Sequence, residues 1–178
     1  KNDVFILASS GTGAMEAAVI NLLSPGDTAL TIQGGKFGER WTELCQAYGI
    51  TAEVLNVEWG KAVNPQEIAK ILQVNPRIKA VFATLCETST GVVNDIKALG
   101  EVVKDTPAVL VVDAISGLGA IDLETDEWFC DMVVSGSQKG LMLPPGLGFI
   151  CASHKATKLS GATKYPRYYF ALRLAKKA

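Results

Sequence analysis

The chain alternates short β-rich runs with stretches of helical pattern over most of its length. Strands are predicted over residues 4–8, 28–33, 50–57, 78–85, 108–112, 132–135 and 148–152. Helices are predicted over residues 13–23, 37–48, 64–74 and 95–104, the third with Asn64 as its cap. Strands that alternate with helices in this way indicate a three-layer α/β fold, in which a mostly parallel sheet is flanked by helices.

Composition narrows the classes of partner. The formal net charge of -1 over 178 residues gives no global field, so we expect no nucleic acid and no membrane partner. The cysteines lie too far apart for the paired spacing of zinc sites, and we expect no metal. Four free, mostly buried thiols are typical of a reducing compartment, which predicts a cytoplasmic location. They are Cys45, Cys86, Cys130 and Cys151.

One predicted strand is apolar throughout and ends in a charge. Val109 to Val112 has the continuous apolarity of a strand buried on both faces, and Asp113 follows it directly. An unpaired carboxylate there would be costly, so Asp113 needs a cationic or hydrogen-bonding partner. The alternative is an aspartate that caps a local turn before Ser116 and Gly117.

A second feature is the run Ser10-Gly11-Thr12-Gly13-Ala14, which joins a predicted strand to a predicted helix. Its glycines let the backbone approach an anion, which free N–H groups of Gly13 and Ala14 would bind together with the helix dipole. The Thr12 hydroxyl adds a donor. A tight turn without a ligand explains such a cluster equally well.

The third feature is Lys139, which lies between Gln138 and Gly140 and is followed by Pro144-Pro145-Gly146. A loop of such restricted conformation is able to hold a lysine at the sheet edge. A lysine amine that holds an aldehyde as a Schiff base, with an aspartate that keeps a pyridine nitrogen protonated, indicates pyridoxal phosphate (PLP). Burial beside the pyridinium would make the amine a usable nucleophile. The alternative is a solvated surface lysine.

The three features follow strands that end near Ala8, Val112 and Ser135. Ligands of open α/β sheets bind outside the carboxyl ends of the strands, so we expect all three features at one sheet edge. Phe37 is able to lay its ring over one face of the cofactor and Ile115 to cover the other, although core packing is the alternative for both. Thr88 offers a hydroxyl for the phenolic oxygen of PLP, or serves only a turn. His154 is interpreted as a surface residue.

These motifs, in this order, resemble the large domain of the class V aminotransferases of PLP fold type I. The likeness extends from about residue 8 to about residue 174 and is strongest to the alanine–glyoxylate and serine–pyruvate aminotransferase group. It implies that Lys139 is the Schiff-base lysine and that Asp113 pairs with the pyridine nitrogen. The phosphate contacts that it implies are Gly13, Ala14 and Gln138. It also implies that Thr88 contacts the ring oxygen or substrate, and that Ile115 packs opposite an aromatic, which is tryptophan in many relatives and Phe37 here.

The resemblance implies a homodimeric enzyme that moves an amino group between a small amino acid, of alanine or serine type, and a 2-oxo acid, of glyoxylate or pyruvate type. It makes residues 1–152 the PLP-binding core and residues 153–178 a basic, aromatic segment that leads toward a smaller C-terminal domain. Because the chain starts in a strand and stops in what looks like a helix at Ala178, we expect it to be a piece of a longer polypeptide. A cysteine desulfurase and a non-catalytic binding module remain alternatives.

Overall fold

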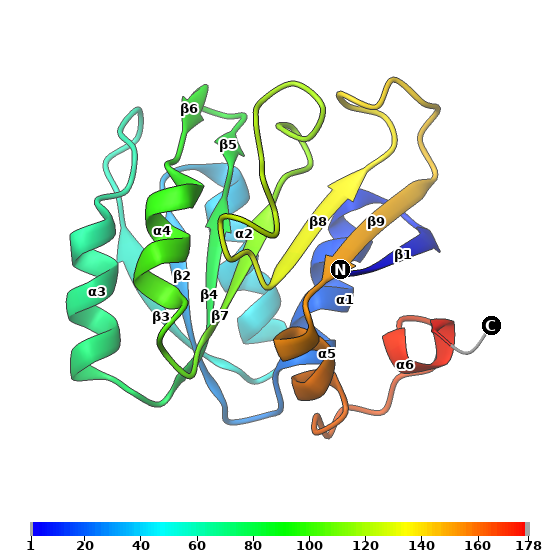
Figure 1. Cartoon of the computed structure of the whole chain (residues 1–178), viewed down its shortest axis with the longest axis horizontal. Helices are drawn as coiled ribbons and strands as arrows, with labels where there is room; N and C mark the ends of the chain where they lie inside the picture. Colours follow the sequence, from blue (N-terminus) through cyan, green and yellow to red (C-terminus); the bar gives the residue numbers. More distant parts are fainter. Residues whose placement is uncertain (1, 177–178) are drawn as a thin grey trace.

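The computed structural model describes residues 2–176 and shows a seven-stranded sheet with helices on both faces (Figure 1). The strand order is β1-β9-β8-β7-β4-β2-β3, and β5 and β6 form a separate hairpin. The strands are β1 (Asp3–Ala8), β2 (Thr28–Gln33), β3 (Thr51–Asn56), β4 (Ile78–Thr84), β5 (Cys86–Glu87), β6 (Val92–Val93), β7 (Val109–Asp113), β8 (Met132–Gly136) and β9 (Leu147–Ala152).

Strand direction confirms a mostly parallel sheet. The strands β3, β2, β4, β7 and β8 pair in parallel, whereas β9 is antiparallel to both of its neighbours, β8 and β1. Because β9 reverses direction between them, β1 and β8 run the same way. The carboxyl ends of β1, β7 and β8 therefore lie at one edge of the sheet, as the sequence predicts.

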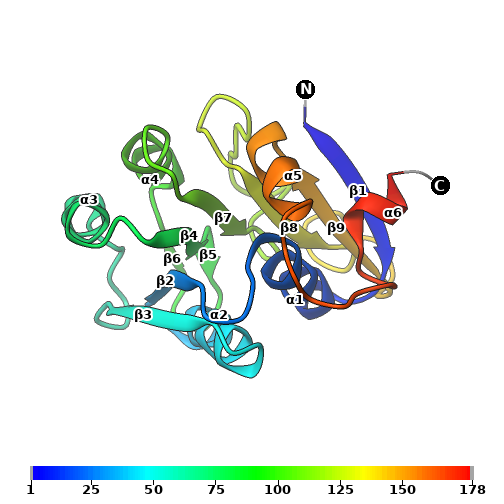
Figure 2. The same cartoon turned by 90° about the horizontal axis from the view of Figure 1, so that it is seen from below.

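The helices cover the sheet from two sides (Figure 2). They are α1 (Gly11–Leu22), α2 (Lys36–Ala47), α3 (Pro65–Val74), α4 (Ile96–Val103), α5 (His154–Ser160) and α6 (Leu172–Ala175). One buried cluster joins α1, α2 and α5 to one face of the sheet, and a second joins α3 and α4 to the other. Within β7, Val111 belongs to the first cluster and Val112 to the second, which explains the apolar run at this strand.

Polar side-chain caps explain where α3 and α1 begin. The Asn64 side chain accepts from the Gln66 N–H at 3.0 Å, which confirms the predicted start of α3. The helix α1 begins two residues earlier than predicted, because the Ser10 hydroxyl caps it and accepts from the Gly13 N–H at 3.2 Å.

The segment after residue 152 packs against α1. Asn21 is fully buried in α1, and its amide donates to the Phe170 carbonyl at 2.6 Å. Its side-chain oxygen accepts from Arg167 at 3.0 Å and from Ser160 at 3.1 Å. Residues 177 and 178, where the sequence predicts that the helix continues, lie outside the described residues. No helix within residues 2–176 is both long enough and apolar enough to cross a bilayer.

Candidate active site

Asp113 is the last residue of β7 and is 3% exposed. Its Oδ1 accepts from the Ile115 N–H at 2.8 Å, so it does cap the local turn that the sequence offers as an alternative. Within residues 2–176 the carboxylate forms no ion pair. Burial raises its pKa to about 6, and nearby Glu87 adds to the rise, while the Ile115 hydrogen bond and Arg40 oppose it. A cation that carries an N–H would relieve this cost.

The first turn of α1 lies at the same edge. A Cβ at Gly11 would lie 2.6 Å from Cδ1 of Ile115, which is itself 7% exposed, so the glycine lets the helix start close to the Asp113 turn. A Cβ at Gly13 would lie 1.9 Å from the Ser9 hydroxyl. Both glycines therefore leave room for neighbouring side chains at the start of α1.

The amides that this turn offers differ in part from those predicted. The Ala14 N–H donates to the Ser10 carbonyl at 3.1 Å, and Gly13 donates to the Ser10 hydroxyl. The prediction of free amides at Gly13 and Ala14 is therefore wrong for the ligand-free chain, because the earlier start of α1 gives Gly13 the Ser10 hydroxyl as acceptor and makes Ala14 the first residue of the helical ladder. Gly11 and Thr12 supply the amides that have no acceptor inside the helix.

Gln138 and Lys139 lie on the turn that follows β8, and both are exposed. A Cβ at Gly136 would lie 3.1 Å from Oε1 of Gln138 and 3.6 Å from the Gly11 amide nitrogen, so the turn lies beside the start of α1. Lys139 is exposed within residues 2–176, so the burial beside a pyridinium that the sequence suggests requires the cofactor itself. Its surroundings within the described residues leave Lys139 open to solvent.

Contacts within the chain hold this turn in place. The Ser137 hydroxyl donates to the Pro144 carbonyl at 2.6 Å, and the Leu143 N–H donates to the Ser137 carbonyl at 3.0 Å. A Cβ at Gly140 would lie 2.4 Å from the Leu118 carbonyl oxygen, so the loop packs closely on the next turn. The loop has the restricted conformation that the sequence predicts.

Phe37 lies half-buried in the first turn of α2. The guanidinium carbon of Arg40 lies 5.0 Å from the centroid of the Phe37 ring, and the guanidinium donates to the Thr12 hydroxyl at 3.1 Å. Arg40 thus contacts both Phe37, the predicted ring-stacking residue, and Thr12 at the start of α1. Sequence reasoning missed it, although its place three residues after Phe37 on a helix puts both side chains on one face.

Thr88 and Ser116 join two further loops of this edge. The Thr88 hydroxyl, which is exposed, forms a 2.5 Å hydrogen bond with the Ser116 hydroxyl, which follows Ile115. The turn between β5 and β6 therefore meets the loop after β7. His154 is exposed at the start of α5, as predicted, and within residues 2–176 no three His, Cys, Asp or Glu side chains gather as a metal site would require.

Comparison with known proteins identifies the family. A family model described as Aminotransferase class-V matches residues 1–165. A soluble hydrogenase 42 kDa subunit from Anabaena cylindrica is 48% identical over 181 residues, which cover 100% of this chain and 47% of that protein. An L-aspartate–glyoxylate aminotransferase from Paracoccus denitrificans is 40% identical over 174 residues, covering 96% of this chain and 44% of that protein.

The fold agrees with this assignment. The crystal structure of an alanine–glyoxylate aminotransferase from Nostoc sp. matches with a TM-score of 0.93 at 29% identity, covering 98% of this chain and 46% of that one. The chain thus spans about half the length of the relatives that it matches. Since the family model covers well over half of the chain, the chain belongs to the class V aminotransferase family, whose cofactor is pyridoxal phosphate.

Proposed function

We propose that this chain is the cofactor-binding part of an aminotransferase that uses PLP. The observation that carries the proposal is the buried Asp113 carboxylate, which has one hydrogen bond and no ion pair within the described residues, at the sheet edge that also carries Lys139 and the start of α1. A phosphate suits the free amides of Gly11 and Thr12, and a protonated pyridine nitrogen suits Asp113. The donors present therefore fit PLP.

Each residue takes a role that its position allows. When bound, PLP supplies the electron sink that makes the substrate Cα–H acidic. Lys139 would hold the aldehyde carbon and, when free, would move the proton at the substrate Cα. Asp113 would keep the ring nitrogen protonated. Phe37 and Ile115 would bind the two ring faces, and Thr88 would bind the ring oxygen or the substrate.

The phosphate site combines backbone and side-chain donors. The first amides of α1, the Thr12 hydroxyl and the Gln138 amide are its proposed donors, and the α1 dipole favours the negative charge. Gly13 and Ala14, which the family resemblance implies, belong to the same turn. Gly13 leaves room for the Ser9 hydroxyl, and Ala14, which is fully buried, packs the start of α1 against the core.

The two aminotransferases described above are named for different amino donors and for the same acceptor. One is named for aspartate and glyoxylate, the other for alanine and glyoxylate. We therefore propose transfer from a small amino acid of alanine or serine type to a small 2-oxo acid, with glyoxylate better supported than pyruvate. Comparing both acceptors with one set of donors in single-turnover kinetics tests this choice.

The test of the site is chemical labelling. Borohydride reduction of the protein with PLP, followed by peptide mapping, is expected to place the label on Lys139. Lys139→Ala should lose the label and the visible absorbance of the bound cofactor, whereas Lys158→Ala, at an exposed lysine of α5, should keep both. Labelling of another lysine, or none with excess cofactor, contradicts the assignment.

A further inference from the structure

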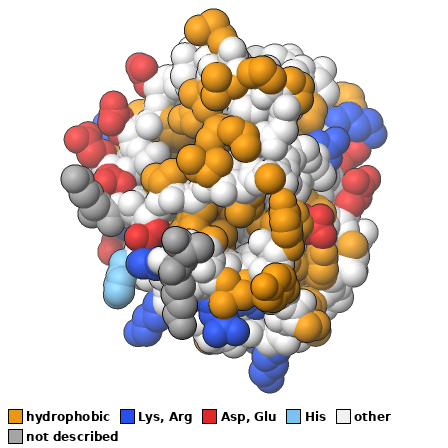
Figure 3. Space-filling model, turned by 90° about the vertical axis from the view of Figure 1, so that its right-hand side faces the viewer, with side chains coloured by type: hydrophobic (Ala, Val, Ile, Leu, Met, Phe, Trp, Pro, Cys, Tyr) orange, Lys and Arg blue, Asp and Glu red, His pale blue; other side chains and the backbone are white. Residues whose placement is uncertain are grey.

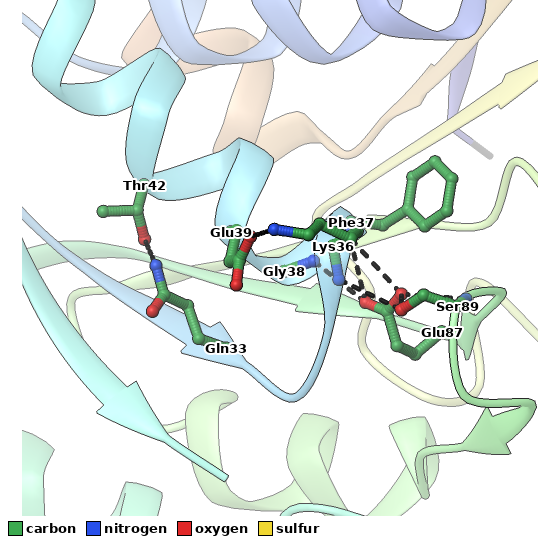
Figure 4. A network of polar contacts seen from close by, with 8 residues as sticks. All are labelled: Gln33, Lys36, Phe37, Gly38, Glu39, Thr42, Glu87 and Ser89. Carbon is green, nitrogen blue, oxygen red and sulfur yellow. Dashed lines mark hydrogen bonds and ion pairs between the residues drawn. The ribbon is translucent and has the colours of Figure 1, made fainter. Parts of the chain in front are cut away.

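Glu87 is 2% exposed, and its carboxylate accepts hydrogen bonds from four donor groups (Figure 4). Oε2 accepts from the backbone N–H of Phe37 at 3.1 Å and of Gly38 at 3.0 Å. Oε1 accepts from the Ser89 N–H at 3.2 Å and from the Ser89 hydroxyl at 2.6 Å. A buried carboxylate with this many donors is satisfied, whereas an unpaired one would be expensive.

This arrangement replaces the usual local cap of a helix. The Ser, Asn or Asp that precedes α1, α3, α4 and α5 caps each of those helices. The residue before α2 is Gly35, which has no side chain to do so, and Glu87 takes over from 49 residues away in the sequence. The negative charge is also favourable at the helix N-terminus.

Gly35 makes the approach possible. A Cβ at Gly35 would lie 2.6 Å from Cγ and Cδ of Glu87 and 2.4 Å from the Ser89 hydroxyl. The Glu87 carboxylate therefore reaches the start of α2 because Gly35 has no side chain. The Ser89 hydroxyl completes it by accepting from the Lys36 N–H at 3.0 Å.

Glu87 joins the two parts of the candidate site that flank it. It holds the backbone of Phe37, the proposed ring-stacking residue, and it precedes Thr88, whose hydroxyl contacts the Asp113 loop through Ser116. A site that is ordered before its ligand arrives loses less conformational entropy on binding.

We propose that Glu87 is a positioning residue, which fixes the Phe37 ring and the Thr88 loop relative to each other in the ligand-free chain. That PLP is the ligand which contacts the Phe37 ring and the Thr88 hydroxyl rests on the proposed function. The ordering itself belongs to the protein alone and is measurable without PLP.

The first experiment reads the ring directly. With 4-fluorophenylalanine placed at position 37 alone, the fluorine spectrum of the ligand-free 178-residue chain is expected to show one narrow resonance. Glu87→Gln keeps the size of the side chain but points an NH2 group at N–H donors, so the resonance should broaden and move toward that of the unfolded chain. Glu39→Gln is the control, because Glu39 lies in the same turn and, among residues 2–176, its carboxylate pairs only with exposed Lys36, at 2.6 Å. An unchanged resonance in Glu87→Gln overturns the proposal.

The second experiment separates positioning from general support of the fold. Glu87→Gln should raise the dissociation constant of PLP about tenfold, but less than about twofold when Phe37 is already Ala. The same tenfold effect in both backgrounds overturns the proposal. If the wild-type chain binds no PLP, the proposed function fails while the fluorine result still decides the ordering.

A second variant covers the case in which Glu87→Gln does not fold. Ser89→Ala removes one donor and keeps the carboxylate, so it should shift the fluorine resonance in the same direction by a smaller amount. Rescue by Glu87→Asp, which keeps the charge, should be partial for both the spectrum and the PLP affinity. If Glu87→Gln unfolds and Ser89→Ala leaves the resonance unchanged, Glu87 supports the fold alone and the proposal is wrong.

Discussion

At the scale of single residues, the buried environment of Asp113 is more favourable when a ligand is bound than in the ligand-free fold. Its pKa is raised from 3.8 to about 6, chiefly by burial. Between these values the unfolded chain ionises while the folded chain stays protonated, so the free energy of unfolding falls as the pH rises through this window. Above pH 6 the buried charge costs up to about 3 kcal/mol.

Asp113→Asn is therefore expected to stabilise the ligand-free chain at neutral pH by about 1 to 3 kcal/mol, because the amide oxygen still accepts from the Ile115 N–H. Urea unfolding from pH 4 to 8 measures it, and the gain should shrink toward pH 4. Asp105→Asn, at an exposed aspartate, is the control. The same Asp113 variant should lose most amino transfer in the full-length protein, since an amide holds no pyridinium. A variant that is less stable at neutral pH would remove the argument.

Residues of the site could be predicted from sequence when their signal is local. Asp113 and Lys139 stand directly after strands, and small residues around them mark turns. Arg40 and Glu87 were missed as functional residues because their partners are distant: Arg40 meets Thr12 across 28 positions, and Glu87 meets Gly38 across 49. Folding brings these pairs together, and no local pattern encodes such contacts.

At the scale of elements, the sequence predicts which segments are strands and helices better than how they pair. All seven strands of the sheet are predicted to within one residue at either end, since each has either an apolar run or a partly alternating pattern. The reversed direction of β9 carries no periodic signal, and the hairpin strands β5 and β6 are two residues each, too short for any period. The start of α1 was misplaced because Gly11 and Thr12 are poor helix formers, and the Ser10 cap overrides them.

Asn21 attaches the C-terminal segment to α1 through several hydrogen bonds. Asn21→Leu would leave the Phe170 carbonyl and the Arg167 and Ser160 donors without this partner. We expect a loss of about 2 to 4 kcal/mol in the free energy of unfolding, because several groups lose their bonds together.

Hydrogen exchange locates the loss. Amides of residues 160–172 should exchange faster in Asn21→Leu, while those of β4 and β7 stay protected. Asn75→Leu, where the amide donates to Glu53 at 2.7 Å on the far side of the sheet, should leave residues 160–172 unchanged. Uniformly faster exchange across the chain would show instead that Asn21 serves the whole core.

At the scale of the whole molecule, apolar side chains remain open on one side. Figure 3 shows hydrophobic side chains gathered on the face that carries β1 and α6. The loop that follows Lys139 adds Met142, which is 89% exposed, and Leu143, which is 49% exposed. Exposed apolar groups beside a site mark a surface that a partner covers. The homodimer that the family resemblance implies would supply that partner and close the site around Lys139.

Met142→Asp tests whether a second copy of the chain covers this loop. A buried charge without a partner opposes association, so the dimer dissociation constant, measured by sedimentation, should rise at least about tenfold. Val74→Asp is the matched control, because Val74 is 84% exposed at the end of α3, away from the Lys139 loop, and the same substitution there should leave the constant unchanged. Circular dichroism should show the same secondary structure in both variants, since neither side chain packs in the core. A dimer whose dissociation constant does not change in Met142→Asp would place the partner surface elsewhere on the chain. A monomeric wild-type chain would show that no second copy covers the loop after Lys139.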